Sequence, residues 1–412
     1  MGGAGRVRDV LVVAEVALAV VLLAGAGLTV RSLQRQTQID PGLVPEGVLT
    51  LTIEMGGTSL FPPDAAAPFS GDTLTGVERQ MSFFRQIVDR SRALPGVVTA
   101  GITSHLPLAG DVWSTSVSRA DQPPPPSEDR LSAVTRIISP DYLRTAGMTL
   151  MAGRSFVDWG EDDGDEVIIN RALANTLWPG IDAVGQRLRL GSDWDDPTPV
   201  VVGVVGDVKQ GTLVDGVKPE FYRPYGQNPF PWNQQTSLAI RTSGRPTAVA
   251  SAVRAMIREL ESAAPVTDIR TMTAIVEEQL FAARAVTSLV AVFAAFAALV
   301  SGLGLFGVIN YLVGQRRREF GIRMALGSSP ASVVRLVVGR GFVLILAGVV
   351  IGGVITAAGA GLVSGLLYEV QGRDPVAFAG ASLGLLLVGL LAVCLPARKA
   401  AAADPTECLR AE

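Results

Sequence analysis

The stretch Gln315-Arg-Arg-Arg-Glu-Phe-Gly-Ile-Arg-Met-Ala-Leu-Gly-Ser-Ser-Pro330 lies between two long apolar runs and carries the densest cluster of basic residues in the chain. Moving arginine side chains across a bilayer is costly, so short loops that contain several of them stay on the cytoplasmic side of a membrane. The sequence therefore predicts that this loop is cytoplasmic and that the two flanking runs are membrane-spanning helices.

Four apolar runs are long enough to cross a bilayer, because a helix rises about 1.5 Å per residue and the hydrocarbon layer is roughly 30 Å thick. The first run follows Arg6 and Arg8, and a cleaved signal peptide is its alternative, since Ala24-Gly-Ala26 resembles a cleavage site. The run exceeds the usual apolar length of a signal peptide, which favours a membrane helix. Small residues are frequent in all four runs, which favours close helix packing. The runs are Val10–Val30, Val286–Val313, Val333–Leu367 and Val376–Leu395.

The region between the first and second runs is polar, rich in Pro, Gly and Asp, and reads as a large domain outside the membrane. Two strand-helix-strand patterns lie near its two ends, separated by a long insertion. This arrangement predicts a split α+β subdomain with a second subdomain inserted into it. The expected elements are Val48–Met55, Gly76–Ala93 and Val97–Ser104, and later Ser237–Thr242, Pro246–Leu260 and Pro265–Arg270.

The sequence offers no pattern for catalysis, cofactor binding or metal binding. It contains no GxxxxGK[ST], GxSxG or HExxH motif, and His105 is its only histidine. The acidic run Glu161–Glu166 lacks the spacing of a calcium-binding EF-hand loop, so a solvated loop is expected. The net charge of −3, without a basic patch interleaved with aromatic residues, argues against a nucleic-acid partner. We therefore expect neither an enzyme nor a bound cofactor.

Glu15 is an acidic residue inside the first membrane helix, and such a residue is a functional candidate by default. The alternative is a structural role, in which its side chain faces a partner helix or reaches toward the lipid headgroups. The arginine-rich loop also has two interpretations. Good helix formers end at Gly327, which suits the end of a helix, and Pro330 suits the start of the next one. The loop is either a short cytoplasmic lever or a simple topology signal.

The run from Arg318 to Gly327 with the following Ser-Ser-Pro resembles the cytoplasmic coupling segment of FtsX-like ABC transporter permeases of the MacB type. The ending Leu395-Pro-Ala-Arg-Lys-Ala-Ala resembles the same family's C-terminus. The large domain resembles the family's periplasmic core domain, and the whole chain also resembles one half of the duplicated orphan permeases. The motifs in the large domain are Ile138-Ser-Pro-Asp-Tyr-Leu-Arg-Thr-Ala-Gly147, Gly153-Arg-Ser-Phe156, Asn170-Arg-Ala-Leu-Ala174, Leu177-Trp-Pro-Gly180, Gly185-Gln-Arg-Leu188 and Val204-Val-Gly-Asp-Val208.

The resemblance implies a permease subunit without its own ATPase site, in which a separate cytoplasmic ABC ATPase binds the ATP. It implies a dimer with a second copy or a homologous half, contact with membrane lipid, and a periplasmic adaptor as a further candidate partner. Export or extrusion of a substrate is the implied function, and its alternative is a signalling or scaffold protein that regulates an envelope enzyme. The implied ATPase-coupling residues are Arg316, Arg317, Arg318, Glu319, Gly321, Arg323 and Gly327.

The predicted fold is thus a bacterial inner-membrane protein of four transmembrane helices, with a large extracytoplasmic α+β domain of two subdomains between helices 1 and 2. Both termini are predicted to be cytoplasmic. The predicted segments are the N-terminus 1–9, helix 1 at 10–31, the outer domain 32–283 (split subdomain 40–107 and 236–272, insertion 108–235), helix 2 at 284–313, the coupling loop 314–330, helix 3 at 331–367, an outer turn 368–375, helix 4 at 376–396 and the tail 397–412, with an FtsX-like permease domain at about 286–405.

Overall fold

The computed structural model describes residues 3–55, 73–110, 113–160, 165–227, 235–316, 319, 322–323, 329–363 and 375–401. The chain divides into two compact units, which are treated separately below. The helical unit comprises Met1–Gln38 and Leu280–Glu412, and the outer unit comprises Ile39–Gln279. The predicted outer turn 368–375 lies, apart from Pro375, outside the described residues, as does most of the predicted C-terminal tail.

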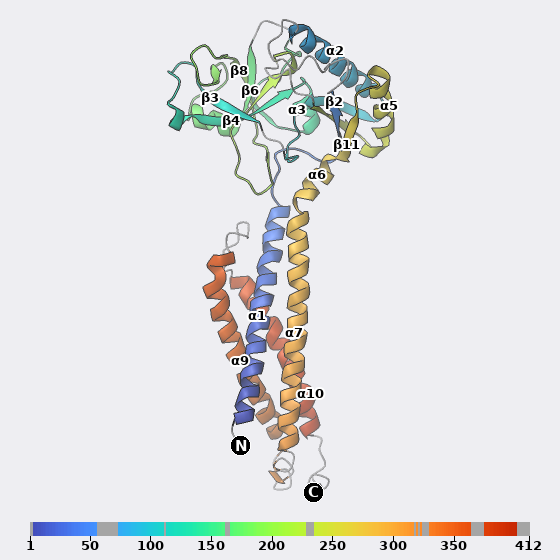
Figure 1. Ribbon diagram of the computed structural model, residues 1–412. Coiled ribbons are helices and arrows are strands. Elements are labelled where there is room, and N and C mark those ends of the chain that lie inside the picture. The colour runs from blue at the N-terminus through green and yellow to red at the C-terminus, as the bar shows by residue number, and fades with distance from the viewer. Residues whose placement is uncertain are drawn as a thin grey trace. The chain divides into compact units, whose positions relative to one another are not determined.

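In the described part of the helical unit, four helices are long and apolar enough to cross a membrane, which confirms the predicted fold class. They are α1 (Gly3–Thr37), α7 (Phe281–Gln315), α9 (Pro330–Val363) and α10 (Pro375–Ala401) (Figure 1). Helix α1 packs against each of the other three. Their shared core consists of branched apolar side chains, among them Val12, Val16, Leu305, Ile309, Val337, Ile345, Leu385 and Val393.

The helix ends differ from the predicted membrane boundaries. Helix α1 continues past residue 31 to Thr37, and α7 begins at Phe281, before the predicted residue 284. Hydropathy marks where a helix leaves the hydrocarbon layer, whereas the segment Arg31–Thr37 contains good helix formers and continues the helix beyond that point. Helix α9 begins at Pro330, one residue before the predicted segment 331–367, and residues 364–367 of that segment lie outside the described part of the chain.

The strands described in the outer unit form one 11-stranded sheet. At one end of the sheet, four antiparallel strands follow the order β11-β1-β10-β2. These strands are β1 (Val48–Glu54), β2 (Val97–Thr103), β10 (Gln235–Thr242) and β11 (Val266–Thr271). Helix α2 (Thr73–Arg92) connects β1 to β2, and η4 (Pro246–Val249) with α5 (Ala250–Leu260) connects β10 to β11. The two predicted strand-helix-strand patterns therefore form one interleaved sheet.

Alternation along these strands explains the first core of the outer unit. Leu49, Leu51 and Ile53 of β1 are fully buried on the face that the helices cover, where they meet Phe84 of α2 and Ile257 of α5. The intervening β1 residues are polar and lie on the opposite face. A period of two in the sequence is thus read out directly as two chemically different faces of the sheet.

The insertion extends the same sheet and has a core of its own. Its fully or largely buried residues include Val167, Ile169, Leu173, Trp178 and Phe221. Its elements are β3 (Ser114–Arg119), η2 (Ser127–Asp129), β4 (Leu131–Ile138), α3 (Tyr142–Ala146), β5 (Leu150–Gly153), β6 (Glu166–Asn170), α4 (Arg171–Leu177), β7 (Leu188–Leu190), β8 (Val200–Val205), β9 (Glu220–Pro224) and η3 (Tyr225–Gln227), and α6 (Met272–Gln279) follows β11.

The two parts of the sheet meet where β2 pairs with β4 through Thr103 and Ile138. Serine hydroxyls complete this short pairing. The Ile102 amide donates to Ser139 Oγ at 2.9 Å, and the Ile137 amide donates to Ser104 Oγ at 3.2 Å. These side-chain bonds add to two backbone bonds between the same segments, from the Ser104 amide to the Ile137 carbonyl at 2.8 Å and from the Ser139 amide to the Ile102 carbonyl at 3.0 Å.

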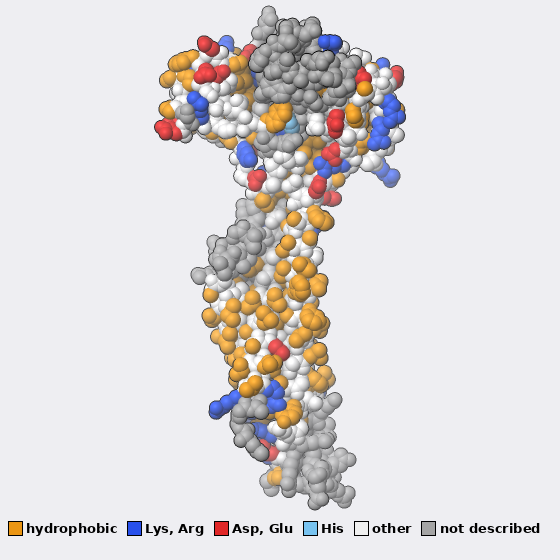
Figure 2. Space-filling view, viewed as in Figure 1, with side chains coloured by type: hydrophobic (Ala, Val, Ile, Leu, Met, Phe, Trp, Pro, Cys, Tyr) orange, Lys and Arg blue, Asp and Glu red, His pale blue; other side chains and the backbone are white. Residues whose placement is uncertain are grey.

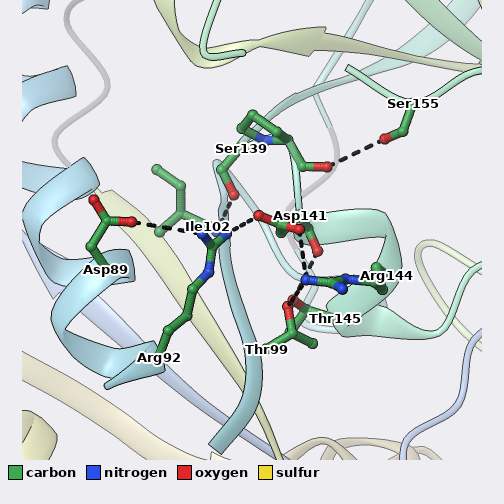
Figure 3. A network of polar contacts seen from close by, with 10 residues as sticks. Asp89, Arg92, Thr99, Ile102, Ser139, Asp141, Arg144, Thr145 and Ser155 are labelled. Atoms are coloured by element: carbon green, nitrogen blue, oxygen red, sulfur yellow. Dashed lines mark hydrogen bonds and ion pairs between the residues drawn. The ribbon is translucent and has the colours of Figure 1, made fainter. Parts of the chain in front are cut away.

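A charged network on the surface spans the same junction (Figure 3). Arg92 at the end of α2 forms an ion pair with Asp141, which precedes α3, and lies 3.6 Å from Asp89. Asp141 also accepts a hydrogen bond from Arg144 at 2.9 Å. Burial lowers the pKa of Arg92, and the neighbouring Asp89 opposes this shift. The network holds the first part of the insertion against helix α2.

A buried ion pair lies inside the insertion. The side chains of Arg136 on β4 and Glu220 on β9 are 1% and 0% exposed, and Arg136 Nε donates to Glu220 Oε1 at 3.2 Å. Gln210 donates from Nε2 to Glu220 Oε2 at 2.5 Å and accepts a bond from Arg136. Burial raises the pKa of Glu220, while the adjacent Arg136 opposes this shift. Parallel pairing of β4 with β9 brings these residues together from distant parts of the sequence.

Candidate functional site

Three of the predicted coupling residues form an ion-pair cluster beyond the end of α7. Glu319 Oε1 lies 2.7 Å from an Arg323 guanidinium nitrogen, and Glu319 Oε2 lies 4.0 Å from Arg316 Nε. The backbone is helical at Glu319 and at Arg323, which places the two residues one turn apart. All three side chains are between 42% and 49% exposed, so solvent screens the pairing.

The other predicted coupling residues lie outside the described part of the chain. These are Arg317, Arg318, Gly321 and Gly327. The structure therefore brings together Arg316, Glu319 and Arg323 through the single carboxylate of Glu319. A coupling role for any of these residues stays a prediction.

Two further contacts join the start of α1 to α7 and α9, and sequence reasoning missed both. The Arg8 guanidinium lies 4.2 Å from the centre of the Tyr311 ring, a cation–π contact between α1 and α7. Arg340 of α9 donates to Asp9 Oδ2 of α1 at 3.3 Å. Arg8 is recognisable in the sequence only as a topology signal, because the helix pairing that gives it a partner is not a local property. Figure 2 shows Lys and Arg side chains gathered at one end of the apolar helices.

Glu15 faces α7 within the helical unit. Ser301 Oγ of α7 donates to the Glu15 carbonyl at 2.9 Å. Gly304 lies one turn further along α7, and a Cβ at this position would overlap the Glu15 carboxylate. Glu15 Oε2 is buried and has no hydrogen-bond partner among the described residues. The Glu15 carboxyl group thus lies in the contact between α1 and α7.

Gly304→Ala is expected to be about 1 kcal/mol less stable than the control variant Gly307→Ala, because its methyl group displaces the flexible end of the Glu15 side chain. The matched control is Gly307→Ala, since a Cβ at position 307 meets nothing within 4 Å. Adding Glu15→Ala to Gly304→Ala should restore most of the lost stability. Thermal unfolding of the detergent-solubilised protein compares the three variants with the wild type. Equal stability of the two alanine variants would show that Gly304 does not hold this contact.

Two parts of the chain match known protein families. Residues 11–260 match the family described as MacB-like periplasmic core domain, and residues 291–405 match the FtsX-like permease C-terminal family. The chain belongs to the MacB-like periplasmic core domain family. It is an ABC transporter permease of the MacB/FtsX type, which confirms the resemblance noted in the sequence.

Two relatives of this permease illustrate the family. One is the uncharacterized ABC transporter permease YknZ of Bacillus subtilis, 25% identical over 69% of this chain and 72% of its own length. The other is the macrolide export ATP-binding/permease protein MacB of Chromobacterium violaceum, 27% identical over 66% of this chain. The permease spans 42% of that MacB. A solved structure of the periplasmic region of MacB from Actinobacillus actinomycetemcomitans aligns with a TM-score of 0.36 at 14% identity, covering 60% of this chain and 97% of that one.

The permease shows no metal centre in the part of the chain that the structure describes, where no three His, Cys, Asp or Glu residues gather closely enough to hold an ion. His105, the single histidine, is buried, and its ring centre lies 4.3 Å from that of Trp113. The acidic run predicted to be a solvated loop lies largely outside the described residues, at 161–164.

Proposed function

We propose that this chain is the membrane subunit that couples ATP hydrolysis by a separate cytoplasmic ATPase to conformational change in its extracytoplasmic domain, for export or extrusion of a substrate. One observation carries the proposal. Helix α7 begins at Phe281, directly after the outer unit ends at Gln279, and runs unbroken to Gln315, next to the cluster of Arg316, Glu319 and Arg323. A movement imposed at the cluster is transmitted along a single rigid element to the chain of the outer unit.

The packing of the helical unit supports transmission of a movement from the cluster along α7 to the outer unit. Helix α1 leads into the outer unit from its other end, and α1 and α7 form the most extensive helix pair of the unit. Hydrogen bonds fix the pair at two levels. Ser301 donates to the Glu15 carbonyl, and Thr287 Oγ1 lies 3.4 Å from the Thr29 carbonyl. The two helices that flank the outer unit in sequence therefore move as one element.

The residues of this chain form no GxxxxGK[ST] motif for binding ATP phosphates, and in this proposal a separate ATPase subunit binds the ATP. It would engage the loop that holds Arg316 and Arg323. The positive-inside rule then places this loop and both termini in the cytoplasm and the outer unit in the periplasm. The functional assembly is a dimer with a second permease copy or a homologous half, and a periplasmic adaptor is a further candidate partner.

Glu319→Gln is the test of coupling, because it removes the charge that positions Arg316 and Arg323 while leaving both arginines in place. The wild-type protein should co-purify with an ATPase and raise its hydrolysis rate. We expect the variant to lower that stimulation by about tenfold, which corresponds to roughly 1.4 kcal/mol of coupling. Glu128→Gln, an exposed acid of the outer unit, is the matched control and should behave as wild type.

Two outcomes would contradict the proposal. Purification of the wild-type protein without any ATPase would leave the loop as a topology signal. Unchanged stimulation by the Glu319→Gln complex would show that the cluster does not transmit the ATPase movement.

A further inference from the structure

A polar cleft lies on the side of the β11-β1-β10-β2 sheet that faces away from α2 and α5. It has a volume of about 230 Å³ and is lined by residues of all three strands β1, β10 and β11 and by the segment after β2. This is several times the roughly 30 Å³ that one water occupies, and less than the roughly 300 Å³ of the smallest drug-sized pockets. The cleft therefore suits a ligand about the size of one sugar ring. Its lining includes Thr52, Glu54, Ser104, Ser237, Asp268 and Arg270.

The strand pattern makes the cleft polar. On β1 the apolar residues face the core, so Thr52 and Glu54 face the cleft. On β11 a bulge brings further polar groups to the same side. Thr50 pairs with Arg270 and Thr52 pairs with Thr267, which leaves two residues of β11 opposite Leu51. The bulge is what allows Thr267, Asp268 and Arg270 to line one cavity.

Backbone strain in the described part of the chain is concentrated at this cleft. Only two of the described residues other than glycine have a positive φ, namely Leu108 at 62° and Asp268 at 49°. Asp268 lines the cleft, and Leu108 lies between the lining residues Leu106 and Ala109. Such conformations cost of order 1 kcal/mol or more and cluster at sites that bind ligands. The strain is an observation independent of the cavity itself.

The charges in the cleft are not balanced. Arg270 is neutralised twice, by Asp268 at 3.0 Å and by Glu278 at 2.5 Å. Glu54 Oε1 accepts a hydrogen bond from the Thr267 hydroxyl at 3.1 Å. Among the described residues, no Arg or Lys nitrogen lies within ion-pair distance of the Glu54 carboxylate. The lining thus offers one carboxylate without a cation, surrounded by hydroxyl groups. Arg270 Nε is also buried without an acceptor in the described part of the chain.

We propose that this cleft binds a small hydroxylated amine of the amino-sugar class. The ammonium group pairs with Glu54, and the ligand hydroxyls exchange hydrogen bonds with Thr52 and Ser237. An anionic ligand is disfavoured, because Arg270 is already neutralised and Glu54 repels a second carboxylate. The site belongs to the outer unit alone, so it does not depend on coupling to an ATPase.

The test uses the full-length protein in detergent and three probes: D-glucosamine, the neutral D-glucose and the anionic D-glucuronate. Saturation-transfer NMR and calorimetry measure binding. We expect glucosamine to bind at least tenfold more tightly than glucose and glucuronate not to bind. Comparable affinities for glucosamine and glucose, or no binding of glucosamine at tens of millimolar, would overturn the proposal.

Two variants connect binding to this cleft. Glu54→Gln should reduce glucosamine affinity at least tenfold, while Glu277→Gln, an exposed acid on α6 that does not line the cleft, should leave it unchanged. Ala109→Trp fills the cleft from an exposed loop position and should abolish binding with all charges retained. This second variant keeps the test decisive if Glu54→Gln does not fold. If a folded Ala109→Trp protein bound glucosamine with wild-type affinity, the ligand would bind elsewhere and the proposed site would be wrong.

Discussion

Arg136→Ala is expected to lower the free energy of unfolding of the outer unit by about 3–5 kcal/mol. The substitution leaves Glu220 in a fully buried position without its cation, and among the described residues the Gln210 amide is then the side-chain donor that remains. Removing one member of a buried pair costs more than the pair contributes, because the remaining charge cannot return to water. Denaturant unfolding of the full-length protein, followed by tryptophan fluorescence, measures the effect.

Two further variants test whether the loss of stability comes from the unpaired, buried Glu220 or would follow the removal of any paired arginine. Arg154→Ala breaks the ion pair with Glu166, whose side chains are 48% and 28% exposed, and should cost at most about 1 kcal/mol. The double variant Arg136→Met with Glu220→Leu should be more stable than Arg136→Ala, because apolar side chains of similar size tolerate burial. If the double variant is less stable than Arg136→Ala, the burial of an unpaired Glu220 charge does not explain the stability lost in Arg136→Ala.

Gly352→Val is expected to disrupt the packing of α9 against α1 and to destabilise the helical unit by about 1–3 kcal/mol or more. A Cβ at position 352 would lie 2.6 Å from the Ala17 carbonyl oxygen, a backbone atom that cannot move aside. Small residues permit this close approach of transmembrane helices, and packing is a principal force that holds such helices together. Thermal unfolding in detergent and the yield of folded protein report the change.

The neighbouring glycine supplies the control for this prediction. Gly353 lies on the same helix, and a Cβ there meets nothing within 4 Å. Gly353→Val makes the same change in helix propensity and in side-chain size, so it isolates the contact with α1. Similar losses in the two variants would mean that the effect comes from β-branching and not from the α1–α9 contact.

Local patterns in the sequence determined much of this fold. The four membrane helices follow from the length and composition of apolar runs, and the strand-helix-strand patterns follow from periods of two and 3.6 residues. The predicted helix at Pro246–Leu260 corresponds to η4 followed by α5 over the same residues. These features depend on neighbours in the chain, so one sequence is enough to read them.

The partners of polar residues were decided by the tertiary structure alone. Glu220 meets Arg136, 84 positions away, only because β9 pairs in parallel with β4 in one particular register. The sequence left open whether Glu15 faces a partner helix, and the packing of α1 against α7 places its carboxylate beside Gly304. The cleft beside Glu54 depends on a bulge in β11, and no pattern of residues in the sequence predicts that bulge. A charge can be read from a sequence, but whether it is neutralised, enclosed or left to bind a ligand depends on contacts between distant segments.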